Sequence, residues 1–334
     1  MCIKNRIKTL CLSILSMLII SSCISQPTGS VKCTLKGEVI DQTQSSQLIL
    51  LKAGENPRVN GENIPINNGK FEYLLDCNHE ELYWLVVDDG LLREIRPVEF
   101  ISERGVINFK LHPINQYDEN KVEGGKLNKE YQDYSNENSI KHNAVGIEIN
   151  AKIEQLKKDG VERIDSELYT QILRENSSFQ EFLRWKLQYA KEHPTIVGYC
   201  ILVSEIKSVP EVTNDISQYS DIYQTIFAPK YPDHPYTTQM INLLTGSSLQ
   251  SGVSFIDFTA IDLTGKPIRL SEQIAGKPAV LHLWASWCGP CRQKGKELIP
   301  VYEEFRNKGF VVIGVARERN SSAAAEAADR KSVV

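Results

Sequence analysis

Two cysteines, Cys288 and Cys291, lie two residues apart in the segment 281–293, LHLWASWCGPCRQ. Thiols at this spacing bind a metal, form a structural bridge or exchange electrons through a reversible disulfide. A structural zinc site needs about four ligands, and no histidine or further cysteine follows the pair. A bridge over so short a loop would constrain the unfolded chain little. The pattern therefore favours thiol–disulfide exchange, with no metal and no cofactor besides the redox-active disulfide.

The flanking sequence predicts different roles for the two thiols. The apolar run AVLHLWA predicts a buried strand before Cys288, and a helical pattern continues to Lys308. At the start of a helix, unpaired backbone N–H groups and the helix dipole favour the thiolate of Cys288. We expect Cys288 to attack the disulfide of a partner, and Cys291 to resolve the mixed disulfide.

Two neighbours of the pair are predicted to support it. Pro290 has no backbone N–H, which suits the first turn of a helix because no hydrogen bond is lost there. Trp284 and Trp287 would shield the thiols from water on one side, although either could be a core residue.

The chain as a whole reads as a soluble multidomain protein. Its 334 residues are 41% hydrophobic and 24% charged, with a net charge of -4, which allows two or three cores. Basic and acidic residues are interspersed, so no nucleic-acid partner is expected. Residues 31–113 contain short alternating runs with a turn signal at Asn68-Gly69, and we expect an antiparallel β-sandwich there. Residues 251–334 predict an α/β domain whose segment 279–316 is one βαβ unit.

The middle region, residues 119–246, shows helical spacing of its apolar residues. Ser178 and Glu181 have the spacing of a capping box that would begin one of its helices. Helix breaks are predicted at three dipeptides: Asp159-Gly160, His193-Pro194 and Ala228-Pro229. We interpret this region as a spacer or partner-binding surface.

The N-terminus predicts export. Residues 1–22 carry a basic start and an apolar stretch shorter than the roughly 20 residues that span a bilayer, as in a signal peptide. Cys23 follows Ile20-Ser21-Ser22, an arrangement that resembles the lipobox of bacterial lipoproteins, so Cys23 would carry lipid. Residues 23–30 would be a flexible tether. We expect a lipid-anchored protein of the cell envelope that faces the periplasm, in the inner or the outer membrane.

Three more cysteines remain in the exported chain. Cys33 and Cys77 lie in predicted strands and could form one bridge, since export permits disulfides. Cys200 lies in the apolar run IVGYCILV and is expected to be a small buried hydrophobe.

The segment WASWCGPC, with GKPAVLHL before it and IPVYEEFRNKGFVVIGVA after it, resembles the thioredoxin superfamily. It is most similar to the exported TlpA- and ResA-type thiol-disulfide oxidoreductases, and the layout of the whole chain is similar to lipoproteins of the Bacteroidetes. The resemblance implies a thioredoxin-like fold, a nucleophilic Cys288 and a resolving Cys291. Gly289 and Pro290 match the dipeptide usual in reducing members.

Three departures limit this resemblance. His282 stands where thioredoxins commonly have a buried acid, and a neutral imidazole could accept the proton of Cys291 near pH 7 or could simply be packed in the core. Lys294 replaces a glutamate of the ResA-type members. The strands, final helix and cis-proline loop of a complete thioredoxin domain have no counterpart after residue 316, so we expect a truncated domain with lowered activity.

The sequence thus predicts a lipoprotein that reduces disulfides of exported proteins and receives electrons from an unidentified membrane donor. One alternative is a thiol peroxidase of the peroxiredoxin group, although WASW before Cys288 differs from the setting usual for a peroxidatic cysteine. Another is a non-catalytic binding lipoprotein whose C-terminal domain is idle.

Overall fold

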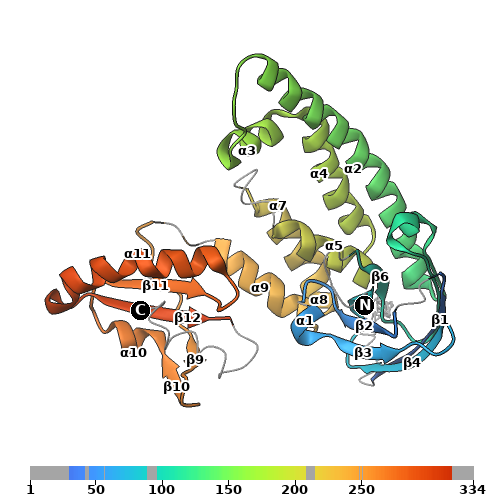
Figure 1. The fold of residues 1–334 in the computed structure, drawn as a ribbon, viewed down its shortest axis with the longest axis horizontal. Coiled ribbons are helices and arrows are strands. Elements are labelled where there is room, and N and C mark those ends of the chain that lie inside the picture. The colour runs from blue at the N-terminus through green and yellow to red at the C-terminus, as the bar shows by residue number, and fades with distance from the viewer. Residues whose placement is uncertain are drawn as a thin grey trace, which may run out of the picture.

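The structure is a computed structural model that describes residues 30–41, 45–55, 57–88, 96–207, 215–247, 249 and 251–317. Figure 1 shows an N-terminal β part in blue, a helical part in green and yellow, and a C-terminal α/β part in orange and red. The predicted signal peptide, the lipidation site Cys23 and most of the tether lie outside the described residues.

Two four-stranded sheets form the β part. The first has the order β4-β1-β7-β8 and the second the order β3-β2-β5-β6. Their bounds are β1 Val31–Val39, β2 Gln47–Lys52, β3 Glu62–Pro65, β4 Lys70–Cys77, β5 Leu82–Val87, β6 Val98–Ile101, β7 Gly105–Leu111 and β8 Lys121–Glu123. Short helical turns α1 (Pro57–Asn60) and η1 (Ile114–Glu119) interrupt the strands.

One hydrophobic core fills the space between the two sheets. Alternate residues of β1, among them Cys33 and Leu35, point into it and meet Leu48 and Phe100 of the other sheet. This alternation is what the sequence pattern predicts for strands with one buried face. The Asn68-Gly69 turn is confirmed, with φ of 51° and 72° at these two residues before β4.

The sandwich is mixed and not wholly antiparallel, so this part of the prediction is wrong. β1 pairs antiparallel with β4 but parallel with β7, with Cys33 beside Gly105 and Val39 beside Leu111. Parallel neighbours require a crossover connection, and here the crossover includes the other sheet. The sandwich also extends to β8, which pairs with β7 inside the region that was predicted to be helical.

The bridge considered between Cys33 and Cys77 does not form, and both thiols are free. The strand register places Cys33 opposite Leu75 and Cys77 opposite Val31, so the two cysteines are diagonal neighbours. Diagonal side chains have Cβ atoms about 7 Å apart, whereas a disulfide needs about 4 Å. Burial also raises the pKa of the Cys33 thiol to about 12, which makes its thiolate scarce.

The helical part packs around one buried helix. Its elements are α2 Lys126–Lys158, α3 Ser166–Glu175, α4 Ser177–Glu192, α5 Ile196–Ile206, α7 Ser217–Ile222, the π-helical turn η2 Tyr223–Phe227, α8 Ala228–Lys230 and α9 Pro235–Ser247. Nearly every residue of α5 is buried, which explains the unbroken apolar run in its sequence. Cys200 is buried there, as predicted.

Two local predictions for the helices are wrong. α4 begins at Ser177 and is capped by Asn176, whose Oδ1 accepts from the N–H of Phe179, so Ser178 does not cap it. The chain also stays helical through Pro229, because the wide turn η2 leads directly into α8. The breaks at Asp159-Gly160 and His193-Pro194 are confirmed by the ends of α2 and α4.

Buried polar contacts join the helical part to the sandwich. The carboxylate of Glu103, 8% exposed, accepts from the backbone N–H groups of Lys126, Leu127 and Asn128 at the start of α2. The side chain of Asn128 pairs with both backbone groups of Ile101. Helix starts need acceptors for such N–H groups, and here an acid from the sandwich supplies them.

His234 lies at the same junction and gives it a pH dependence. Its Nε2–H donates to the carbonyl of Glu80, and its Nδ1 accepts from the N–H of Tyr236 at 3.1 Å. Both ring nitrogens are therefore engaged only in the neutral form. Burial lowers the pKa of His234 from 6.5 to about 4.

Because the folded pKa of His234 lies below the unfolded one, we expect stability to fall as the pH drops from about 6.5 to 4. Between these values the unfolded chain binds a proton that the folded chain excludes, a loss of up to about 3 kcal/mol. Chemical unfolding measured across this range checks it. His234→Gln, whose amide does not titrate, should flatten this part of the profile. An identical slope in that variant would contradict the assignment.

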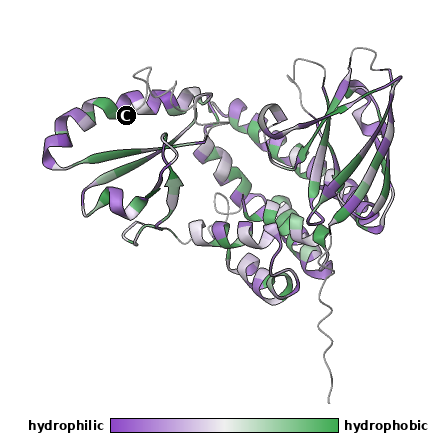
Figure 2. Ribbon diagram, turned by 90° about the horizontal axis from the view of Figure 1, so that it is seen from below, coloured by the Kyte–Doolittle hydropathy of each residue, from purple (hydrophilic) through white to green (hydrophobic). Residues whose placement is uncertain are grey.

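The C-terminal part contains the cysteine pair. Its elements are β9 Thr259–Ile261, β10 Pro267–Arg269, α10 Leu270–Ile274, β11 Ala279–Trp284, α11 Gly289–Phe305, the 3-10 turn η3 Arg306–Lys308 and β12 Val311–Ala316. β11 and β12 pair in parallel, which confirms the βαβ unit. Gly309, with φ 88°, ends the helical stretch as expected. In Figure 2 both strands are largely green, whereas α11 carries purple and green residues, as a helix with one packed face does.

Candidate functional site

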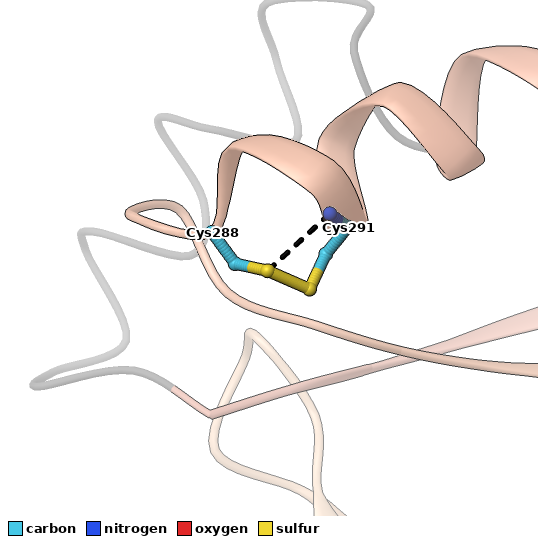
Figure 3. Close-up of a disulfide and its surroundings, with 2 residues drawn as sticks. All are labelled: Cys288 and Cys291. Atoms are coloured by element: carbon cyan, nitrogen blue, oxygen red, sulfur yellow. Dashed lines mark hydrogen bonds between the residues drawn. A yellow bond between two sulfur atoms is a disulfide. The ribbon is translucent and has the colours of Figure 1, made fainter. Parts of the chain in front are cut away.

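Cys288 and Cys291 lie at the start of α11 and are joined by a disulfide (Figure 3). Cys288 is the N-cap residue, and its Sγ accepts from the backbone N–H of Cys291 at 3.3 Å. The first turn of α11 holds no acidic residue that would compete for its N–H groups. Both cysteines are partly exposed. The arrangement places one sulfur where helix N–H groups stabilise negative charge, as the sequence predicted.

Backbone contacts fix the turn between β11 and α11. The N–H of Cys288 donates to the carbonyl of Ala285, and the carbonyl of Cys288 accepts from the N–H of Arg292. Pro290 is the second residue of α11, a position where its missing N–H costs nothing. Gly289 is exposed, and a Cβ at this position would meet no other atom within 4 Å. The cysteines thus lie on a turn held by backbone hydrogen bonds, and Gly289 between them faces open space among the described residues.

The two tryptophans differ in their surroundings. Trp284 is 6% exposed and belongs to the core, whereas Trp287 is 59% exposed beside Cys288. Trp287 is therefore no core residue, and its role beside the cysteines stays a prediction. An exposed indole next to a reactive thiol offers an apolar surface to a bound polypeptide.

His282 lies on the buried face of β11. Strand alternation places it with Trp284 on the face that α11 packs against, while Leu281 and Leu283 are exposed on the other face. The side chain is 8% exposed, and its Nε2 has no hydrogen-bond partner among the described residues. Buried polar atoms are nearly always paired, so an orphaned ring nitrogen on the strand that leads to the cysteines is a functional candidate.

Two basic residues follow the cysteines. Lys294 is exposed, and its Nζ forms an ion pair with Glu297 at 2.7 Å, which raises the pKa of Lys294. The ammonium group of Lys294 is thus paired with Glu297 and not with the cysteines. Arg292 was not singled out from the sequence; its Nε is buried and unpaired within the described part of the chain. The only sequence feature that could have indicated Arg292 as a site residue is its position directly after Cys291.

No group of three or more His, Cys, Asp or Glu side chains in the described ranges could hold a metal ion. Within the same ranges no helix is long and apolar enough to cross a bilayer.

Comparison with known proteins finds matches for two parts of the chain. Residues 252–333 match the model of the AhpC/TSA family. The C-terminal part of this chain is a thioredoxin-like domain. Residues 33–131, which cover all but the first two residues of the sandwich, match a domain of unknown function, DUF4369.

Curated bacterial proteins are similar to the same part of the chain. The thiol-disulfide oxidoreductase ResA of Bacillus subtilis is 31% identical over 68 residues, which is 20% of this chain and 37% of that protein. The thioredoxin-like protein YneN of the same organism is 34% identical over 64 residues, 19% of this chain and 37% of that protein. The chain thus spans less than two fifths of the length of these relatives.

A solved structure is also similar. The thioredoxin domain of a thiol-disulfide oxidoreductase from Bacteroides vulgatus is 31% identical with a TM-score of 0.24, over 25% of this chain and 61% of that one.

Proposed function

We propose that this protein is a thiol-disulfide oxidoreductase that reduces disulfides of exported proteins. The observation that carries the proposal is the disulfide at the start of α11, in which the Sγ of Cys288 accepts a helix N–H. That geometry stabilises a thiolate at Cys288 once the disulfide is reduced. The relatives named thiol-disulfide oxidoreductase support the same chemistry.

The exchange takes place in two steps. The Cys288 thiolate of the reduced protein attacks one sulfur of the target disulfide, and the other target sulfur leaves as a thiolate that takes up a proton. The Cys291 thiolate then attacks the Sγ of Cys288 and releases the second target sulfur. The target gains two electrons and two protons, and the protein ends in the disulfide form present in the structure. A membrane donor would restore the dithiol.

His282 is the proposed proton acceptor for Cys291 in the second step. It is buried on the α11 side of β11 and keeps one ring nitrogen free of protein partners in the described residues. A positioned base typically contributes about 10²–10⁴-fold to a step that moves a proton.

We expect His282→Asn to slow the release of the second target thiol by at least about tenfold near pH 7 and to leave the first attack unchanged. The amide occupies similar space but does not accept a proton. Stopped-flow measurement of the two phases with a disulfide peptide separates the steps. Equal slowing of both phases would indicate a purely structural role for His282.

The location is proposed with the activity. Lipid on Cys23 would anchor the protein in the cell envelope, with the tether 23–30 leaving the cysteine pair in the periplasm. Exported protein disulfides and a membrane electron donor are then the partners.

Insulin reduction tests the function. The full chain with dithiothreitol should accelerate the precipitation of insulin chains over dithiothreitol alone, and it should turn over many times. Rapid consumption of hydrogen peroxide without insulin reduction would contradict the proposal and identify a thiol peroxidase instead. If the chain shows neither insulin reduction nor peroxide consumption, the non-catalytic binding protein is the remaining alternative.

A further inference from the structure

The most exposed large apolar side chains in the described ranges lie on α2, far from the cysteine pair. Ile140 is 71% and Ile147 72% exposed. α2 is 33 residues long, about 50 Å, and Figure 1 shows it along the outer edge of the helical part. Its inner face packs through Val145 and Ile149, so the two isoleucines point to the opposite side.

The two isoleucines belong to a regular stripe. Exposed residues Ile140, Ala144, Ile147 and Ala151 follow each other at spacings of four, three and four. Alternating spacings of three and four place side chains on one helix face and are the pattern of a coiled-coil seam. These four residues form the α2 stripe.

We propose that the α2 stripe is the contact surface of an antiparallel homodimer of this chain. A two-fold axis between residues 145 and 146 pairs each stripe residue with the one equally far beyond the axis. Ile140 then faces Ala151 of the second copy, and Ala144 faces Ile147. Large side chains meet small ones in each of the four central layers, which lets two helices approach within about 8–10 Å.

The charges at the ends of the stripe match the same axis. Asp133 and Lys158 are exposed in the same seam positions. The axis pairs Asp133, whose carboxylate also contacts Lys129 Nζ of its own helix at 2.7 Å, with Lys158 of the second copy at both ends. The layer between, Glu137 with Glu154, joins like charges, but each already has a lysine partner: Lys141 Nζ at 3.4 Å and Lys157 Nζ at 2.8 Å. A parallel arrangement would place Asp133 against Asp133 and gain no such pair.

A membrane is a less suitable occupant. A helix that lies on lipid headgroups carries a basic polar face. The stripe is flanked by both signs, since Glu137, Glu148 and Glu154 are exposed neighbours and so is Lys152. The seam is also short, so we expect a reversible dimer of modest affinity.

Sedimentation velocity of the full chain at several concentrations tests the proposal. The wild-type protein should show a concentration-dependent dimer, and Ile140→Lys should raise its dissociation constant at least about tenfold. Folding should not change, because Ile140 is exposed; thermal unfolding checks this. Ile241→Lys is the matched control, since Ile241 is 50% exposed on α9 and lies outside the stripe.

The end charges provide a sharper test. Asp133→Lys should weaken the dimer several-fold at low salt, and the reciprocal double variant Asp133→Lys/Lys158→Asp should restore it, because the pair is re-formed with reversed signs. A wild-type chain that stays monomeric, or a double variant weaker than the single one, would overturn the antiparallel dimer. Loss of binding to phosphatidylglycerol vesicles in Ile140→Lys without a change in sedimentation would overturn it in favour of lipid.

Discussion

Cys288→Ser is expected to abolish insulin reduction, whereas Cys291→Ser is expected to keep the first attack and stall after it. A serine at position 288 has no thiolate for the N–H groups of α11 to stabilise, so turnover should fall at least about a hundredfold, to the background of dithiothreitol. With serine at 291, Cys288 still forms a mixed disulfide, but nothing within the protein displaces it. The two variants should therefore fail at different steps.

Mass spectrometry after mixing with a disulfide peptide distinguishes the two variants. Cys291→Ser should accumulate an adduct of one peptide thiol that dithiothreitol removes, and Cys288→Ser should not. Cys77→Ser is the matched control, because Cys77 is a partly exposed free cysteine of the sandwich and should leave turnover unchanged. The proposed order of attack is refuted if Cys288→Ser, and not Cys291→Ser, captures the peptide.

Gly125→Ala is expected to destabilise the junction of the sandwich and the helical part by about 3 kcal/mol. Gly125 precedes α2 with φ 80°, and a Cβ there would lie 2.0 Å from the carboxylate carbon of Glu103. Alanine would therefore expel the group that accepts the N–H groups of Lys126, Leu127 and Asn128. Urea unfolding measures the loss.

Gly160→Ala is the control for this change. Gly160 also has positive φ, 94°, but a Cβ there would meet nothing within 4 Å. Its substitution tests backbone strain alone and should cost about 1 kcal/mol. Equal losses in the two variants would show that the collision with Glu103 is relieved at little cost.

The parts of this molecule that sequence patterns predicted are those set by local chemistry. The apolar run before Cys288 and the glycine at 309 define the βαβ unit, because a buried strand and a helix stop depend on neighbouring residues alone. The position of the cysteine pair at the start of α11 was predictable from the same local sequence, an apolar strand followed directly by a helical pattern. Neither required knowledge of distant contacts.

Contacts between distant segments were not predictable in this way. Glu103 caps a helix that begins more than twenty residues later, and a capping pattern within a few residues does not contain it. Asn176 displaced Ser178 as the cap of α4 because the helix begins two residues earlier than its apolar spacing indicated. The orphaned nitrogen of His282 became visible only when α11 covered β11.

The parallel pairing of β1 with β7 also governs the order in which the sandwich can assemble. Residues 33–39 of β1 find this partner only in residues 105–111, about seventy positions later. Pairings between remote segments are slow because the chain must first close a long loop. During folding β1 can pair with β4 first, and its other edge stays open until β7 is in place. An open strand edge is a site where another chain can pair.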